Sequence, residues 1–111
     1  MAAGRGDNRV EEYRMLRHIV VFKFKHGVTR ENPRVAEVYA QLAQLPGLIP
    51  EVREWEQGYN VSGRDIAYDM ALFSTFENQE ALQRYSDHPA HRAVVGRLRE
   101  ICTWHIVDYV I

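Results

Sequence analysis

The chain has 111 residues, one cysteine and a formal net charge of −1. A chain of this length buries its own core as one domain, so folding requires neither a disulfide nor a metal. No basic stripe with interleaved aromatic residues is present, which argues against nucleic acid as a partner. A single cysteine suits a reducing cytosol, and the apolar runs are too short for a membrane span or a secretion signal, so we expect a cytoplasmic protein without a membrane partner.

Residues 1–14 are polar and charged, and we expect a flexible arm there, followed by a folded domain over residues 15–111. Residues 16–25 are rich in β-branched and aromatic side chains, which predicts a strand. One face of this strand is almost wholly apolar, and the other is apolar only in its middle. The first face carries Leu16, His18, Val20, Phe22 and Phe24.

The following segments show helix and strand patterns in turn. Apolar side chains at helical spacing predict a helix that begins near residue 32, with Thr29 as a possible cap, and stops at Pro46 and Gly47. Two later strands joined by a short polar turn predict an antiparallel hairpin. The predicted elements are helix 32–45, strand 52–61, strand 68–76, helix 77–85, helix 89–101 and strand 103–111.

This order, with the last two helical pieces counted as one, is β-α-β-β-α-β, the ferredoxin-like arrangement of the α+β class. Such a protomer has a four-stranded antiparallel sheet with its helices on one face. The opposite face is too apolar to leave in water, so we expect a homodimer that pairs through this helix-free sheet face into a dimeric α/β barrel. The residues of that face are Ile19, Val21, Ala71, Phe73, Val107 and Tyr109.

Residues 85–91 read Tyr-Ser-Asp-His-Pro-Ala-His and hold the densest group of hydrogen-bonding and titratable side chains. Pro89 has no N–H and disfavours a helical conformation at His88. One helix is therefore expected to end here and another to begin, with Asp87 or Ser86 as its cap.

Tyr85 and His91 flank this break, and their side chains can point into one space. A functional interpretation makes them an acid–base pair, in which neutral His91 accepts a proton and Tyr85 donates a hydrogen bond to a developing oxyanion. A structural interpretation makes His91 a bonding group of the bend and Tyr85 a core residue. Both interpretations stay open at this point.

His18 lies on an apolar strand face, where it is either a hydrogen-bonded core residue or part of a pocket wall. Asp108 lies on the matching face of the last strand and could orient a histidine or form an ion pair. We predict a pocket between sheet and helices that suits a small apolar or aromatic ligand. Its predicted walls are His18, Val20, Phe22, Met70, Leu72, Trp104 and Asp108.

Metal and cofactor sites are weakly indicated. His88 and His91 are three residues apart, and with His18 they could supply three metal ligands, but His88 precedes the proline and its ring need not converge with the others. Phosphate-binding and dinucleotide-binding motifs are absent. We therefore predict no metal and no cofactor.

Four segments together resemble the stress-responsive dimeric α/β-barrel family, also called Dabb: 16–25 (LRHIVVFKFK), 58–60 (GYN), 85–91 (YSDHPAH) and 107–109 (VDY). The resemblance covers residues 15–111. It implies a ferredoxin-like protomer paired into a barrel and a role in stress response.

One plant branch of this family consists of polyketide cyclases that use a tyrosine and a histidine in a cavity between sheet and helices. By position in the motif, Tyr85 and His91 match that pair, and His18 matches a histidine of the same cavity. Met70 stands where the cyclase carries a further pocket histidine, a departure that weakens the case for cyclase chemistry.

The sequence thus supports a homodimer that binds a small apolar or aromatic molecule, or that acts without a ligand as a stable stress-associated barrel. One alternative is a cofactor-independent polyketide cyclase or lyase that uses the tyrosine and histidine pair. Another, from analogy with dimeric ferredoxin-like barrels, is a small monooxygenase or a haem-binding protein with His91 as axial ligand.

Overall fold

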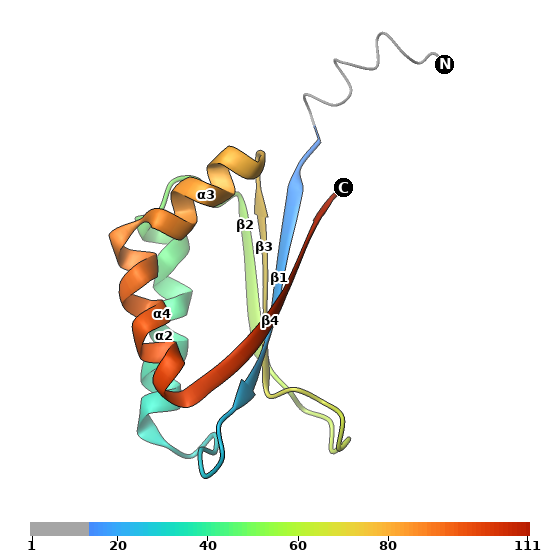
Figure 1. Ribbon diagram of the computed structural model, residues 1–111, viewed down its shortest axis with the longest axis vertical. Coiled ribbons are helices and arrows are strands. Elements are labelled where there is room, and N and C mark those ends of the chain that lie inside the picture. Colours follow the sequence, from blue (N-terminus) through green and yellow to red (C-terminus); the bar gives the residue numbers. More distant parts are fainter. Residues whose placement is uncertain (1–13) are drawn as a thin grey trace, which may run out of the picture.

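Four strands form one antiparallel sheet in the order β2-β3-β1-β4, which confirms the predicted ferredoxin-like arrangement (Figure 1). The computed structural model describes residues 14–111, so the arm predicted for residues 1–14 lies, except for Arg14, outside the described residues. The strands are β1 (Leu16–Phe24), β2 (Glu54–Tyr59), β3 (Met70–Phe76) and β4 (Cys102–Val110).

Alternation along β1 decides what the sheet buries. Leu16, His18, Val20 and Phe22 are buried, whereas the residues between them are half-buried. Antiparallel register places the partners of His18, which are Ser74 on β3 and Asp108 on β4, on the same face. This face therefore brings residues from distant parts of the sequence under one helical layer.

The helices α2 (Pro33–Leu48), α3 (Gln79–Asp87) and α4 (Pro89–Ile101) all cover that face of the sheet, as Figure 1 shows. Their apolar stripes pack on the strands, and the shared core removes these side chains from water. Within residues 14–111, the helices are all too short or too polar to cross a bilayer. The buried residues of the helical layer include Val35, Val38, Leu42, Leu45, Ala81, Tyr85, Val94, Leu98 and Ile101.

The predicted end of the first helix at Pro46 is wrong, because α2 continues through Pro46 to Leu48. Proline removes only its own N–H, and three residues later the N–H of Ile49 still bonds to the carbonyl of Leu45 at 2.9 Å. Leu45 and Ile49 are both buried, so packing holds the last turn in place.

Helix caps also differ from the sequence interpretation. Asn32, not Thr29, caps α2, because its side chain accepts a hydrogen bond from the N–H of Arg34 at 3.0 Å. His88, not Asp87 or Ser86, caps α4, since its Nδ1 accepts from the N–H of Ala90 at 3.0 Å. The proline that follows places residue 88, rather than its predecessors, at the cap position.

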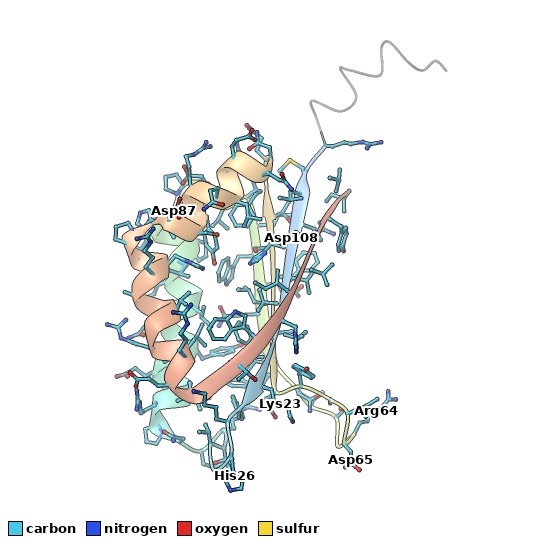
Figure 2. All side chains as sticks on the ribbon, in the orientation of Figure 1. Lys23, His26, Arg64, Asp65, Asp87 and Asp108 are labelled. Atoms are coloured by element: carbon cyan, nitrogen blue, oxygen red, sulfur yellow. The ribbon has the colours of Figure 1, made fainter. Side chains whose placement is uncertain are left out.

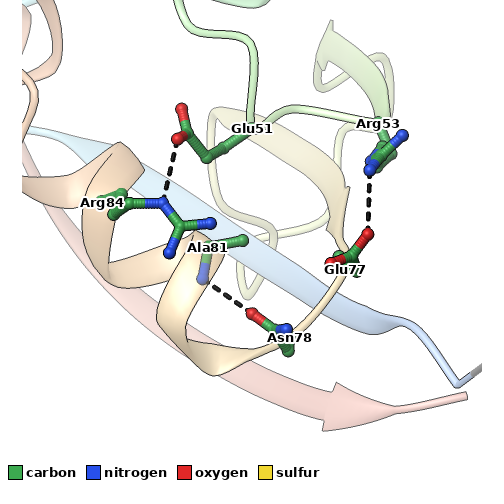
Figure 3. A network of polar contacts seen from close by, with 6 residues as sticks. All are labelled: Glu51, Arg53, Glu77, Asn78, Ala81 and Arg84. Atoms are coloured by element: carbon green, nitrogen blue, oxygen red, sulfur yellow. Dashed lines mark hydrogen bonds and ion pairs between the residues drawn. The ribbon is translucent and has the colours of Figure 1, made fainter. Parts of the chain in front are cut away.

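A surface network anchors α3 to the segment before β2 (Figure 3). Asn78 caps the helix by accepting from the N–H of Ala81 at 2.9 Å. Arg84 donates to Glu51 at 3.0 Å, which lowers the pKa of the Glu51 carboxyl. Arg53 pairs with Glu77 at 3.0 Å. These contacts fix the orientation of the helix that carries Tyr85.

The other sheet face carries no helix. Val107 and Tyr109 on β4 are 60% and 44% exposed, although both are apolar enough to favour burial. Tyr68, which the alternation placed in β3, lies before that strand, and its ring packs against His105 at a centroid distance of 5.8 Å. His105 is exposed, and its register partner Val21 belongs to the helix-free face.

Candidate functional site

The break between α3 and α4 brings Tyr85 and His91 together. Tyr85 lies in the last turn of α3, and His91 lies in the first turn of α4. Pro89 holds His88 in an extended conformation, so the chain turns between the helices. As a result the two rings meet with their centroids 4.5 Å apart.

A backbone contact determines which nitrogen of His91 carries the proton. Nδ1 of His91 lies 3.0 Å from the carbonyl oxygen of Ser86. A carbonyl oxygen only accepts hydrogen bonds, so Nδ1–H donates, and the neutral ring keeps its lone pair on Nε2. Among the described residues, the hydrogen bond of His91 is made by Nδ1, and Nε2 has no partner. This nitrogen is therefore available to a ligand.

Burial gives the two side chains complementary protonation states. It lowers the pKa of His91, the Ser86 carbonyl raises it in part, and the nearby His18 lowers it again. Burial also raises the pKa of Tyr85 well above its ordinary value of 10.0. At neutral pH, His91 is consequently a neutral acceptor and Tyr85 is a protonated donor.

Tyr85 is 1% exposed and serves the core as well as the site. Its ring packs against Phe76 and Trp55, with centroid distances of 4.9 and 6.2 Å. Its hydroxyl, however, has no hydrogen-bond partner in the part of the chain that the structure describes, and desolvation alone accounts for its raised pKa. The ring thus has a packing role, while the hydroxyl remains open to a ligand.

His18 and Asp108 form a second polar pair beside the first. They are register partners on β1 and β4, and the Nδ1 of His18 donates to the carboxylate of Asp108 at 2.5 Å. Asp108 lies on the side of the sheet that faces the helices (Figure 2). The ring of His18 meets that of Tyr85 edge-on at 6.3 Å. Asp108 therefore orients a histidine, one of the two roles that the sequence allowed.

A cavity of about 230 Å³ lies next to these side chains, between the sheet and the helices. Its walls are mainly apolar, and its polar side chains other than Arg99 belong to His18, Tyr85, Ser86 and His91, of which His18, Tyr85 and His91 contact one another. The lining residues are His18, Val20, Phe22, Leu42, Leu72, Tyr85, Ser86, His91, Val94, Val95, Leu98, Arg99, Trp104 and Ile106.

Five of the seven residues predicted for the pocket walls line this cavity, namely His18, Val20, Phe22, Leu72 and Trp104. Met70 is buried beside Phe22 but does not line the cavity, since it lies at the start of β3, two residues before the lining residue Leu72. Asp108 does not line the cavity, but its carboxylate is hydrogen-bonded to His18, which does.

Apart from Tyr85 and His91, the sequence interpretation missed the helical side of the cavity, and on β4 it missed Ile106. Val94, Val95 and Leu98 were visible as an apolar stripe, and Ile106 as an inward strand position, yet periodicity does not show which part of a stripe stays uncovered. Arg99 gave no signal at all, since its charge is typical of a solvated helix face.

No three histidine, cysteine, aspartate or glutamate side chains of residues 14–111 come together in a way that could hold a metal ion. His88, considered as a ligand with His91 and His18, uses its Nδ1 to cap α4. A larger hollow of about 460 Å³ near Met15 and Val110 contains neither histidine nor tyrosine, so the acid–base groups are not there.

Comparison with known proteins agrees with this architecture. The chain is 46% identical over 95 residues to an uncharacterised protein of Streptomyces coelicolor, covering 86% of this chain and 98% of that protein. It is 28% identical over 78 residues to olivetolic acid cyclase of Cannabis sativa, covering 68% of this chain and 75% of the cyclase.

A solved structure with the same fold is a dimeric ferredoxin-like protein of unknown function from Thermobifida fusca. It has 26% identity and a TM-score of 0.78, and the match covers 88% of this chain and 92% of that one. Residues 16–111 also match the family described as the stress responsive A/B barrel domain, Dabb. The chain therefore belongs to the stress responsive A/B barrel domain family.

Proposed function

We propose that this protein binds a small, mainly apolar molecule in the cavity beside Tyr85 and His91. One observation carries the proposal: an apolar cavity contains a hydroxyl donor and a ring-nitrogen acceptor, neither of which has a partner among residues 14–111. Small-molecule sites are typically apolar cavities with a few convergent polar groups, and a ligand that bonds both groups supplies the partners that the protein leaves open.

The size and chemistry of the cavity define the ligand class. An apolar cavity of about 150 Å³ accommodates benzene, so a space of about 230 Å³ holds a substituted ring. A phenol or enol oxygen accepts from Tyr85 and donates to Nε2 of His91, whereas a ketone oxygen only accepts from Tyr85. We therefore favour an aromatic compound with a phenolic, enolic or carbonyl oxygen.

The proposal includes a homodimer formed through the helix-free sheet face. Val107 and Tyr109 expose apolar surface there, and Nε of Arg17 is buried on this face without a partner among the described residues. A second copy would cover the apolar side chains and leave the cavity, on the opposite face, intact. The dimeric T. fusca protein with the same fold supports this pairing.

Acid–base catalysis is a second candidate, favoured by the fixed tautomer of His91 next to the protonated hydroxyl of Tyr85. In such a reaction a C–H bond next to a carbonyl breaks, the proton moves to Nε2, and the electron pair forms an enolate. The Tyr85 hydroxyl stabilises the enolate oxygen. This chemistry is that of a cofactor-independent cyclase or lyase, and the resemblance to olivetolic acid cyclase supports it.

Calorimetric titration with 4-ethylphenol tests the binding proposal. Val95 lines the cavity and is half-buried, so Val95→Phe fills the space with little strain on the core. Ala93 is exposed on the same helix and outside the cavity, which makes Ala93→Phe the matched control. We expect binding by the wild type and by Ala93→Phe, and a loss of about tenfold or more in Val95→Phe. Absence of binding to the wild type, or equal binding by Val95→Phe, would contradict the proposal.

A further inference from the structure

The wall of the cavity carries a positive charge and no negative charge. No aspartate or glutamate lines it, and the one permanently charged side chain in its wall is Arg99. The nearest carboxylate of the site, that of Asp108, lies behind His18 and is bonded to it. A ligand inside the cavity therefore meets a cation without an opposing wall carboxylate.

Arg99 also differs from the other arginines of α4. Arg92 pairs with Asp87, and Arg97 donates to the side chain of Gln41. The guanidinium of Arg99 has no hydrogen-bond or ion-pair partner among residues 14–111. Lys25 approaches the same turn and donates to the carbonyl oxygen of Arg99 at 2.5 Å, which places a second cation near this end of the cavity.

The position of Arg99 determines how long a ligand must be to contact both Arg99 and His91. Arg99 is exposed, as is Ile106 on the facing strand, so these residues mark the solvent end of the cavity between α4 and β4. His91 lies eight residues earlier on the same helix. At about 1.5 Å per residue, the two positions are about 12 Å apart along the helix axis. An aromatic ring with a short chain spans this distance when the side chains of His91 and Arg99 both extend toward the ligand.

We infer that the cavity selects an aromatic carboxylate, with its phenolic or carbonyl oxygen at Tyr85 and His91 and its carboxylate at Arg99. Arg99 is then the specificity-determining residue. A guanidinium binds a carboxylate through two parallel hydrogen bonds between opposite charges. A neutral amide of the same shape forms no ion pair with the guanidinium. This inference rests on the proposed function, because it requires the cavity to bind a small molecule, and it adds the charge and the length of that molecule.

The test compares 3-(4-hydroxyphenyl)propanoate with its primary amide by calorimetric titration at neutral pH. The two probes share their ring, chain and phenol and differ only in charge at the far end. We expect the wild type to bind the carboxylate about tenfold more tightly than the amide, a preference that shrinks at higher salt. Arg99→Gln should abolish the preference and leave the affinity for the amide within about twofold.

Arg97→Gln is the matched control, because it removes the same charge from the same helix outside the cavity, and it should keep the preference. Equal binding of both probes by the wild type, or a preference that survives Arg99→Gln, would overturn the inference while the binding proposal stands. If the wild type binds neither probe, both fail. A loss of the preference in Arg97→Gln as large as in Arg99→Gln would assign the effect to general surface charge and overturn the role of Arg99.

Discussion

The ring of His91 lies against that of Tyr85, with centroids 4.5 Å apart, although the two residues belong to different helices. Pro89 creates this contact, because it ends α3 and starts α4 within a single turn of chain. The pair combines an acceptor and a donor that the rest of the described chain leaves unbonded.

Tyr85→Phe should separate the packing role of the ring from the chemical role of the hydroxyl. Because the hydroxyl has no partner among the described residues, its removal should change the free energy of unfolding by less than about 1 kcal/mol. The affinity for 4-ethylphenol should fall about tenfold. Chemical denaturation and calorimetry measure the two effects. A loss of more than about 2 kcal/mol with unchanged affinity would show that the hydroxyl is structural.

His91→Gln should reduce proton abstraction if the catalytic candidate is correct. Proton NMR in D₂O would follow exchange of the methyl hydrogens of 4-hydroxyacetophenone, which lie next to its carbonyl. We expect the wild type to accelerate this exchange, and His91→Gln to slow it by about a hundredfold or more, since a positioned base contributes about that much. Exchange at the buffer rate with wild-type protein would remove the catalytic candidate and leave the binding proposal in place.

Stability should depend on pH through His91. Its pKa in the folded protein lies below the ordinary value of 6.5, so the unfolded chain takes up the proton first as the pH falls. The free energy of unfolding should therefore decrease from pH 6.5 down to the folded pKa and change no further below it through this group. In His91→Gln the decrease should be smaller between pH 7.5 and 5. Identical pH profiles for the two proteins would count against burial of a neutral His91.

Val107→Glu should separate the protomers. Val107 is 60% exposed on the helix-free face, and a carboxylate there would lose its hydration when a second copy covers it. Analytical ultracentrifugation at micromolar concentration should show a wild-type dimer and a Val107→Glu monomer. Leu48→Glu alters an apolar residue on α2 that is 55% exposed, and this variant should remain dimeric. A monomeric wild type would refute the homodimer.

His88→Ala should weaken α4 at its start. The Nδ1 of His88 satisfies the N–H of Ala90, and loss of a side-chain cap typically costs about 1 kcal/mol. His88→Asn should restore most of this stability, because asparagine is a strong capping residue. Thermal unfolding of both variants checks the expectation. Equal destabilisation by alanine and asparagine would show that His88 contributes something other than the cap.

Much of this fold is predictable from local pattern. Alternation in residues 16–25 identified the buried face of β1, and Pro89 located the start of α4 at its observed residue. Pro46 misled the prediction, because burial of Leu45 and Ile49 outweighs one missing hydrogen bond. Such a balance depends on tertiary packing, which periodicity along one helix does not contain.

The candidate site was predictable only where it follows from strand alternation or from the helix break at a proline. His18, Val20 and Phe22 share a face by alternation, and Tyr85 and His91 flank a proline. Arg99 was not predictable, since a helix-surface arginine gives the same pattern whether it faces solvent or the mouth of a cavity. Met70 was placed in the wall because alternation reports the face of a strand and not how far along that strand the cavity extends.

The most direct test is a crystal structure of the protein soaked with 4-ethylphenol. We predict electron density for the ligand in the cavity, with the phenol oxygen within about 3 Å of both the Tyr85 hydroxyl and Nε2 of His91. A cavity closed by Phe22, Leu98 and Trp104, or a ligand bound elsewhere while these two groups remain unbonded, would contradict a small-molecule site at this pair.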